Sequence, residues 1–213
     1  MEYTRRTDPV FYNAGDAGAL IDDSTAQAIS SFVKSKYGFD TGSYDQYNNY
    51  SQSSKLFNKL DWKINDRHTL SLKNNTVFSE ASNLERDGAN FRFSGIDFVQ
   101  KNQASTTTLE LKSRFSDQLN NTLLLGYSAI RDYRNPTSSN VMFPQVEIAY
   151  NGGTIFLGND REASVFNMKQ KTFEITDNLT YKVGNHTKTP GLTYTIDQFA
   201  SRVQAQLGLR YNF

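Results

Sequence analysis

Apolar and polar residues alternate strictly in several paired segments of this chain, and each pair is joined by a short polar turn. In residues 55–64 one alternating set is mainly apolar and the other is mainly charged. A period of two places successive side chains on opposite faces of an extended strand. The apolar set is Leu56, Leu60, Trp62 and Ile64, and the charged set is Lys55, Lys59, Asp61 and Lys63. The pattern predicts β-strands with one apolar and one polar face.

The same alternation recurs in residues 107–127 and 173–183, and the joints between strands differ in length. Tight turns are predicted at 65–68, 116–121 and 184–186, and long polar connections at 7–52, 81–104 and 134–166. Short turns at one end and long loops at the other are typical of outer-membrane β-barrels. We therefore expect an all-β fold, an antiparallel outer-membrane-type β-barrel or part of one, with about eight strands. It would form a single domain or barrel fragment over residues 1–213.

Strict alternation also predicts which side chains would face lipid in such a barrel. The expected lipid-facing set is Leu109, Leu111, Leu123, Leu125, Phe173, Ile175, Leu207, Leu209 and Tyr211. The expected interior set is Glu110, Lys112, Arg114 and Arg210. The three long connections would lie together at the cell surface, and the tight turns on the opposite side of the membrane.

Composition narrows the classes of protein further. Only 37% of the 213 residues are hydrophobic and the mean hydropathy is −0.62, with no apolar run long enough for a membrane helix. The net charge of +1 argues against nucleic acid as a partner. Cysteine is absent, which excludes disulfides and thiolate chemistry. Residues 1–6 have no apolar stretch of a secretory signal, so the chain either stays in the cytoplasm or is part of a longer protein.

Two long connections carry local structure signals. Residues 24–37 predict one short loop helix, with Ser24 to Gln27 as a capping box and Gly38 just past its end. We expect this helix to pack its loop onto the barrel rim, although contact with a ligand is the alternative. Residues 146–150 and 154–157 flank Asn151-Gly152-Gly153, which predicts a β-hairpin above the membrane.

The last strand ends on an aromatic residue. Every odd position from 203 to 213 is apolar, and the chain closes on Phe213. An aromatic at this point would anchor a barrel strand at the membrane interface. The terminus resembles the C-terminal signal by which the barrel-assembly machinery recognises outer-membrane proteins. The residues that match this signal are Gln206, Gly208, Tyr211 and Phe213.

A further resemblance covers residues 55–78, 107–128 and 166–187. Segments such as 58–68 (NKLDWKINDRH) and 173–180 (FEITDNLT) resemble barrel strands of TonB-dependent outer-membrane receptors. They are most similar to Oar-like receptors that carry a carboxypeptidase-regulatory-like domain. The resemblance implies a location in the cell outer membrane and transport of a polar substrate. It also implies three partners: outer-membrane lipid, the barrel-assembly machinery, and a TonB-type motor that acts only through a plug domain, which is not visible here.

The chain is too short for the 22 strands of such a receptor. The strand that must rise between Val183 and the terminal strand can only be Thr187–Thr195, which contains Pro190-Gly191, poor residues for a central strand. We therefore expect the C-terminal barrel region only, truncated or internally shortened between Thr189 and Leu192. The alternative function is a small eight-stranded structural or adhesive barrel. A secreted soluble β protein is a third interpretation.

No pattern for catalysis or cofactor binding occurs in the sequence. His68 and His186 are the only histidines, and both fall in predicted tight turns without nearby metal-ligand partners. Asp16, Asp22 and Asp23 lack the spaced oxygens of a calcium loop. We expect no catalytic residue, no metal site, no cofactor and no enzymatic activity.

Overall fold

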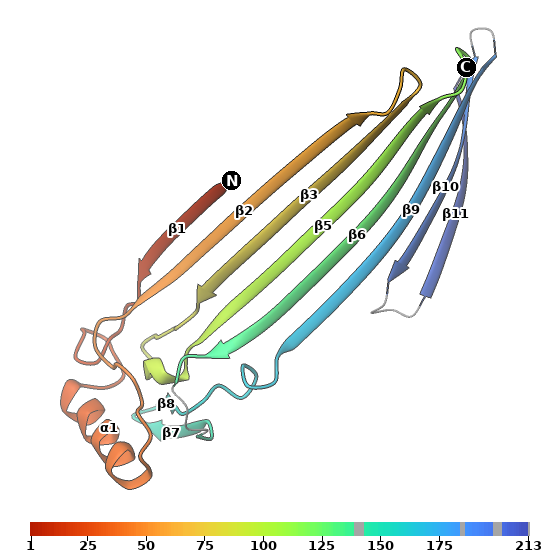
Figure 1. Cartoon of the computed structure of the whole chain (residues 1–213). Helices are drawn as coiled ribbons and strands as arrows, with labels where there is room; N and C mark the ends of the chain where they lie inside the picture. Colours follow the sequence, from red (N-terminus) through yellow and green to blue (C-terminus); the bar gives the residue numbers. More distant parts are fainter. Residues whose placement is uncertain (139–142, 184–185, 198–201, 213) are drawn as a thin grey trace.

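In the computed structural model the chain forms a long antiparallel sheet that carries a smaller structured region at one end (Figure 1). The structure describes residues 1–138, 143–183, 186–197 and 202–212, and the side chains as far as Lys182. The main sheet has eight strands in the order β1-β2-β3-β5-β6-β9-β10-β11. Its strands are β1 (Glu2–Pro9), β2 (Asn48–Lys63), β3 (His68–Ser82), β5 (Phe98–Arg114), β6 (Leu119–Pro136), β9 (Asn167–Val183), β10 (His186–Asp197) and β11 (Arg202–Asn212). The predicted all-β, antiparallel architecture with about eight strands is confirmed.

A second, three-stranded sheet lies within the long connections. It consists of β4 (Asn90–Arg92), β8 (Gly153–Leu157) and β7 (Val146–Tyr150) in that order, and β4 pairs with β8 in parallel. The helix α1 (Asp23–Tyr37) and a short 3-10 helix, η1 (Ser94–Ile96), complete the regular elements. This small sheet was not expected beyond its hairpin, because β4 has only three residues and pairs far along the chain.

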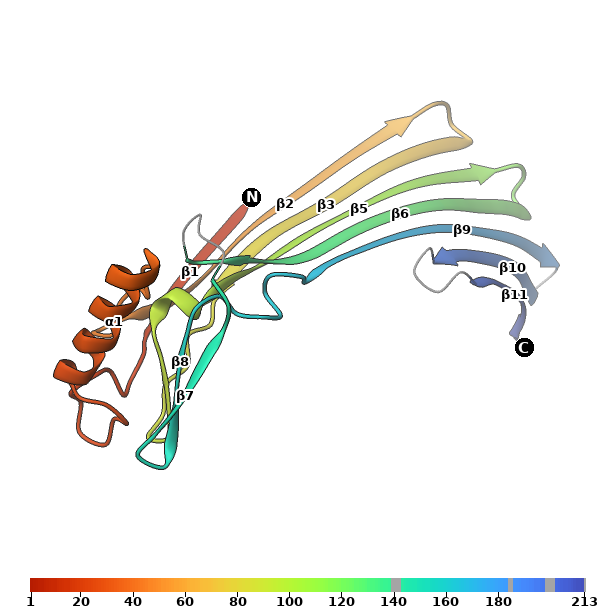
Figure 2. The same cartoon turned by 90° about the horizontal axis from the view of Figure 1, so that it is seen from below.

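The predicted alternation of short and long joints is confirmed, but the long connections are shorter than the predicted 7–52, 81–104 and 134–166, because the neighbouring strands continue into those ranges. The predicted turn at 184–186 includes residues 184 and 185, which lie outside the described part. Within the described residues, β2 and β3 are joined by residues 64–67, and β5 and β6 by residues 115–118. The long connections between β1 and β2, β3 and β5, and β6 and β9 all emerge at the opposite end of the sheet, where they gather into one body (Figure 2). The sheet therefore has a bare end with tight turns and an end covered by structured loops.

The helix and the hairpin also form as predicted, with one correction at the helix N-terminus. The N-cap is Asp22, whose carboxylate accepts a hydrogen bond from the Thr25 backbone N–H at 2.7 Å, and not the predicted capping box that starts at Ser24. Gly38 closes the helix in the left-handed region at φ 69°, as expected. In the hairpin, Asn151 and Gly152 both have positive φ angles, as the central residues of a type I′ turn require.

The register of the ladders gives the sheet two chemically different faces. Residues that are direct partners across an antiparallel pair share a face. One face, called the apolar face below, carries Leu56, Leu60, Trp62, Leu70, Leu72, Phe78, Leu109, Leu111, Leu123, Leu125, Tyr127, Phe173, Ile175, Leu179 and Tyr181. The other, called the polar face, carries Lys55, Lys59, Asp61, Lys73, Glu110, Lys112, Asp132 and Glu174, together with the apolar Phe57, Leu124 and Ile130. The predicted division of side chains between two faces is thus confirmed for these strands.

The same register continues into the last two strands. The ladders to β10 and β11 place positions 207, 209 and 211 in the alternating set of the apolar face and position 210 in the other. β10 is the strand expected between β9 and the terminal strand, and it forms despite Pro190. Its ladder with β9 omits Thr189 and Pro190. Asp177, the partner of Leu123, is a charged residue within the apolar stretch of this face. Toward the end that carries the long connections, the same face also carries Glu80, Lys101, Arg131, Lys169 and Lys171.

The buried apolar core lies in the loops and not in the sheet. Among the described side chains, every buried hydrophobic residue belongs to the connections, including Phe39, Phe91 and Phe93. On the apolar face, by contrast, Leu60 is 66% and Trp62 is 62% exposed. A sheet of a water-soluble protein normally buries its apolar face against another layer. Here no described element covers it.

The main sheet is open in the described part of the chain. β1 pairs with β2 alone and β11 with β10 alone, and these two edge strands lie at opposite margins of the sheet (Figure 1). The closed barrel that the sequence suggested is therefore not present within these residues.

Candidate functional site

The long connections fold into one body with its own core, here called the end module (residues 10–47, 83–97, 137–138 and 143–166). Phe91 and Phe93 meet edge to face with centroids 5.4 Å apart, and Phe39 stacks on Phe143 at 4.6 Å. Ala26 and Val33 of α1 are buried in the same cluster. The helix thus packs against the other connections, not onto the rim of the sheet as expected. Loops that share a core can present a fixed surface.

A buried arginine ties two of these connections together. Arg86 is only 7% exposed, and its guanidinium lies 4.8 Å from the centroid of the Phe91 ring. It donates four hydrogen bonds, to the carbonyl oxygens of Arg92 (2.9 Å), Asp45 (2.8 Å) and Ser43 (3.0 Å) and to Asn13 Oδ1 (2.6 Å). Burial lowers the pKa of Arg86 to about 10, so the group stays charged at neutral pH. Its role is to hold the end module together.

A second buried group joins the end module to the sheet. Asp97, next to the first residue of β5, accepts hydrogen bonds from the backbone N–H groups of Asn83 (3.1 Å) and Phe98 (2.7 Å). The Tyr47 hydroxyl donates to its other oxygen at 3.0 Å. Burial raises the pKa of Asp97, and burial together with this neighbouring carboxylate raises the pKa of Tyr47. Tyr47 therefore remains a neutral donor, and the pair fixes where the long connections leave the sheet.

The end module has an apolar hollow of about 760 Å³ between α1 and β7. Its walls include Ile29, Phe32, Tyr37, Phe143 and Ile148. Phe32 and Tyr37 are 55% and 52% exposed. The hollow can accept an apolar group, but it holds no set of acid, base or nucleophile.

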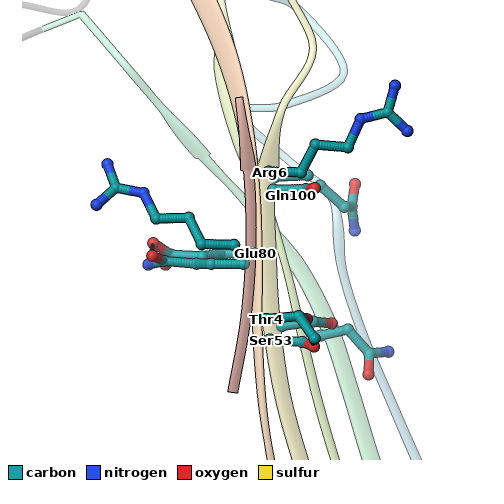
Figure 3. Close-up of a pocket in the computed structure, with 11 residues that line it drawn as sticks. Thr4, Arg6, Ser53, Glu80 and Gln100 are labelled. Atoms are coloured by element: carbon teal, nitrogen blue, oxygen red, sulfur yellow. Dashed lines mark hydrogen bonds between the residues drawn. The ribbon is translucent and has the colours of Figure 1, made fainter. Parts of the chain in front are cut away.

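A smaller hollow of about 280 Å³ lies beside the edge strand β1. Figure 3 shows that Thr4, Arg6, Ser53 and Gln100 project from one side of the strands and Glu80 from the other. The carboxylate of Glu80 is already occupied by Lys101 at 3.2 Å and by the Gln52 amide at 2.6 Å. Arg6 lies on the opposite face from Glu80, whereas Arg5 shares the face of Glu80. The three charged groups therefore do not converge on one ligand, and the hollow follows the open edge of the sheet.

The polar face is the remaining candidate surface for a polar ligand. Its charges are partly paired, with Lys59 2.7 Å from Asp61 and Lys112 3.2 Å from Glu110. The Asn102 amide donates to Asp132 at 3.1 Å, and the Arg134 guanidinium donates to the Gln100 side chain at 2.9 Å. This mixture of amides, hydroxyls and ion pairs can hydrogen-bond a polar solute along the length of the sheet.

The structure adds little to the predicted assembly signal. Gln206, Gly208 and Tyr211 belong to the strand β11, whose side chains are outside the described part, and Phe213 lies outside the described residues. The grouping of these four residues as a signal stays a prediction.

Arg86 and Asp97, which organise the end module, were not predicted from the sequence. The one signal in the sequence was the group of apolar residues Phe91, Phe93 and Ile96 within a predicted loop, which indicates that this loop is buried.

Neither histidine lies where the sequence predicted. His68 opens β3 and His186 opens β10, so both are strand residues and not turn residues. The ring of His68 is hydrogen-bonded to the Ser113 hydroxyl at 2.9 Å. Among the described residues, no group of three or more His, Cys, Asp or Glu side chains could hold a metal ion. In the same part of the chain no helix has the length and apolarity to cross a membrane.

Comparison with known proteins returned no match of any kind. No family model, no curated protein and no solved structure matches the chain. Function must therefore be argued from the sheet and the end module themselves.

Proposed function

We propose that this chain is part of the wall of an outer-membrane β-barrel and belongs to a TonB-dependent receptor that binds and transports a polar substrate. In this arrangement the apolar face contacts lipid and the polar face lines the interior. The observation that carries the proposal is the location of apolar side chains. In the described part of the chain the sheet exposes its apolar face, while the buried core is confined to the end module.

Burying one large apolar side chain stabilises a protein in water by about 1.5–3 kcal/mol, so exposing a continuous face of them is costly. Soluble monomers rarely expose apolar patches larger than a few hundred Å². The apolar face extends over β2, β3, β5, β6 and β9, with Leu60, Trp62 and Phe78 more than half exposed. Lipid chains would cover this face without any further protein layer.

Strand length supports the same proposal. A tilted strand crosses a bilayer in about 9–11 residues. The strands β2, β3, β5, β6 and β9 have 16, 15, 17, 18 and 17 residues. They would therefore extend beyond the bilayer on one side. Toward the end module the apolar face becomes polar, with Glu80, Lys101 and Arg131 in place of Leu and Phe, as expected of strands that continue into water.

The receptor assignment rests on the resemblance of the strand sequences and on the character of the polar face. A polar interior suits passage of a hydrophilic substrate, and the structured end module would form part of its entrance. Outer-membrane lipid and the barrel-assembly machinery are the proposed partners, and a TonB-type motor would act through a plug domain. No catalytic role is proposed.

Trp62 is the only tryptophan in the sequence and lies on the apolar face, so it reports directly on this proposal. In vesicles of brominated phosphatidylcholine we expect its fluorescence to be strongly quenched and shifted to the blue. The matched control is Lys63→Trp in a Trp62→Phe background, which moves the indole to the polar face of the same strand. That variant should be quenched weakly. A chain that stays dispersed in water without detergent, with Trp62 unquenched, would refute a lipid-facing sheet.

The alternative is a closed eight-stranded barrel with a structural or adhesive role, and the eight strands of the sheet are the observation in its favour. Its closure requires β1 and β11 to pair, but these strands lie at opposite margins (Figures 1 and 2). The absence of native cysteine allows a cross-linking test.

Single cysteines placed along Tyr3–Thr7 should not form disulfides within one chain with cysteines along Ala205–Leu209. Leu109→Cys with Leu125→Cys, which are direct partners, provides the positive control. Efficient cross-linking between β1 and β11 in refolded protein would favour the closed eight-stranded barrel over the receptor wall.

A further inference from the structure

Three cations lie together on the apolar face, close to the end of the sheet that carries the end module. Arg131 on β6 and Lys169 on β9 are direct partners across the ladder, and Lys171 follows two residues later on the same face. Like charges placed directly opposite each other destabilise a sheet. This arrangement therefore calls for a compensating anion.

The protein does not supply that anion within the described side chains. No carboxylate lies within 4.0 Å of Arg131, Lys169 or Lys171 there. The neighbouring Lys101, on the same face, is instead paired with Glu80 at 3.2 Å. The guanidinium of Arg131 lies 4.2 Å from the centroid of the Tyr133 ring, and its Nε–H donates to the Asn167 side chain at 3.3 Å. The arginine is thus held in place, whereas both lysine side chains are exposed.

The surface around the cations is hollowed. A depression of about 260 Å³ is lined by the three cations and by Phe78, Gln103 and Ala129. On the side of the tight turns, the next aromatic residues on this face are Tyr127 and Phe173, which are direct partners. They are 44% and 38% exposed. A depression that carries three cations among apolar residues is therefore continuous with the apolar face.

We propose that this depression binds the phosphate of a phosphorylated membrane lipid. The lipid chains then lie along the apolar face, on the side of the tight turns. The inference rests on the proposed function, because it requires this face to contact lipid. An arginine fork can hold two phosphate oxygens, and lysines add point charges. A basic residue near a membrane surface contributes about 1 kcal/mol to attraction of an anionic lipid, which corresponds to roughly a fivefold preference. The charge favours an anion, and continuity with the apolar face favours a lipid over a soluble anion.

The test uses a tryptophan placed beside the depression. In the Trp62→Phe, Phe173→Trp variant of the full chain, quenching is measured in phosphatidylcholine vesicles that contain brominated phosphatidic acid, or brominated phosphatidylcholine at the same mole fraction. We expect phosphatidic acid to be preferred by at least about fivefold at this site. Adding Arg131→Gln, Lys169→Gln and Lys171→Gln should reduce the preference to about one.

Two controls separate a site from a general charge effect. Lys55→Gln, Lys59→Gln and Lys63→Gln remove the same number of charges from the polar face and should leave the preference unchanged. Lys169→Arg with Lys171→Arg keeps the charges and should retain it. Strong quenching by both lipids without preference would overturn the lipid site but leave a lipid-facing sheet intact.

Other outcomes are equally decisive. Absence of quenching by either lipid would overturn the proposed function together with this inference. Loss of the preference on addition of millimolar inorganic phosphate at constant ionic strength would show that the depression is a site for free phosphate and would overturn the lipid assignment.

Discussion

Leu111→Arg is expected to destabilise the protein in a bilayer by about 2–4 kcal/mol, the cost of an arginine on the lipid face near the membrane midplane. Leu111 is the direct partner of Leu70 and of Leu123, so it lies in the middle of the apolar face. The guanidinium would have to enter hydrocarbon, and Asp177, a carboxylate on the same face, lies two strands away beyond Leu123. The measurement is reversible unfolding by denaturant from phosphatidylcholine vesicles, compared between variant and parent.

Thr106→Arg provides the control for this substitution. Thr106 lies on the polar face of the same strand, opposite Asn75 and Ser128, and is exposed. Introducing the same side chain there should change the free energy of unfolding by less than about 0.5 kcal/mol. Equal effects of the two variants, or a harmless Leu111→Arg, would mean that the apolar face does not lie in lipid.

Arg86→Lys is expected to loosen the end module, with a loss of about 2–4 kcal/mol in its local stability. One ammonium cannot reach the four acceptors that the buried guanidinium satisfies, so several carbonyl oxygens would be left without donors. The suitable readout is hydrogen exchange at amides bonded within the module. Phe93 N–H, which donates to the Phe156 carbonyl, and Thr154 N–H, which donates to the Ala89 carbonyl, are two such reporters.

Arg161→Lys is the matched control, because the Arg161 side chain is 79% exposed. It should leave exchange at both reporters unchanged. Exchange in the main sheet should be unaffected by either variant, since the core of the end module contains no residue of the long strands. If the two reporter amides exchanged at the parent rate in Arg86→Lys, the guanidinium would not be the group that holds the two connections together.

The strands were predictable because their period of two is a local property of the sequence. The alternation around Leu109, Glu110 and Leu111 predicts faces correctly, and the polar turn before His68 sets the register of β2 against β3. Gly38 and Asn151-Gly152 marked a helix end and a hairpin through their conformational preferences. These features needed no knowledge of distant contacts.

The end module was not predictable in this way, because its contacts join residues far apart in the chain. Arg86 binds the Asn13 side chain and the Ser43 carbonyl, and β4 pairs with β8 some sixty positions later. The local sequence does not indicate that the three loops share a core. The N-cap was misplaced for a smaller reason, since Asp22 and Ser24 are both good capping residues and only the fold selects between them.

The central claim is that the apolar face of the sheet contacts lipid, and nitroxide labels on four successive residues test it most directly. Single cysteines at Leu109, Glu110, Leu111 and Lys112 would be labelled in the protein refolded into vesicles. The labels at 109 and 111 should collide mainly with oxygen, which concentrates in lipid, and those at 110 and 112 mainly with a water-soluble nickel complex. If 109 and 111 reported water while 110 and 112 reported lipid, or if all four reported water, the account would be contradicted.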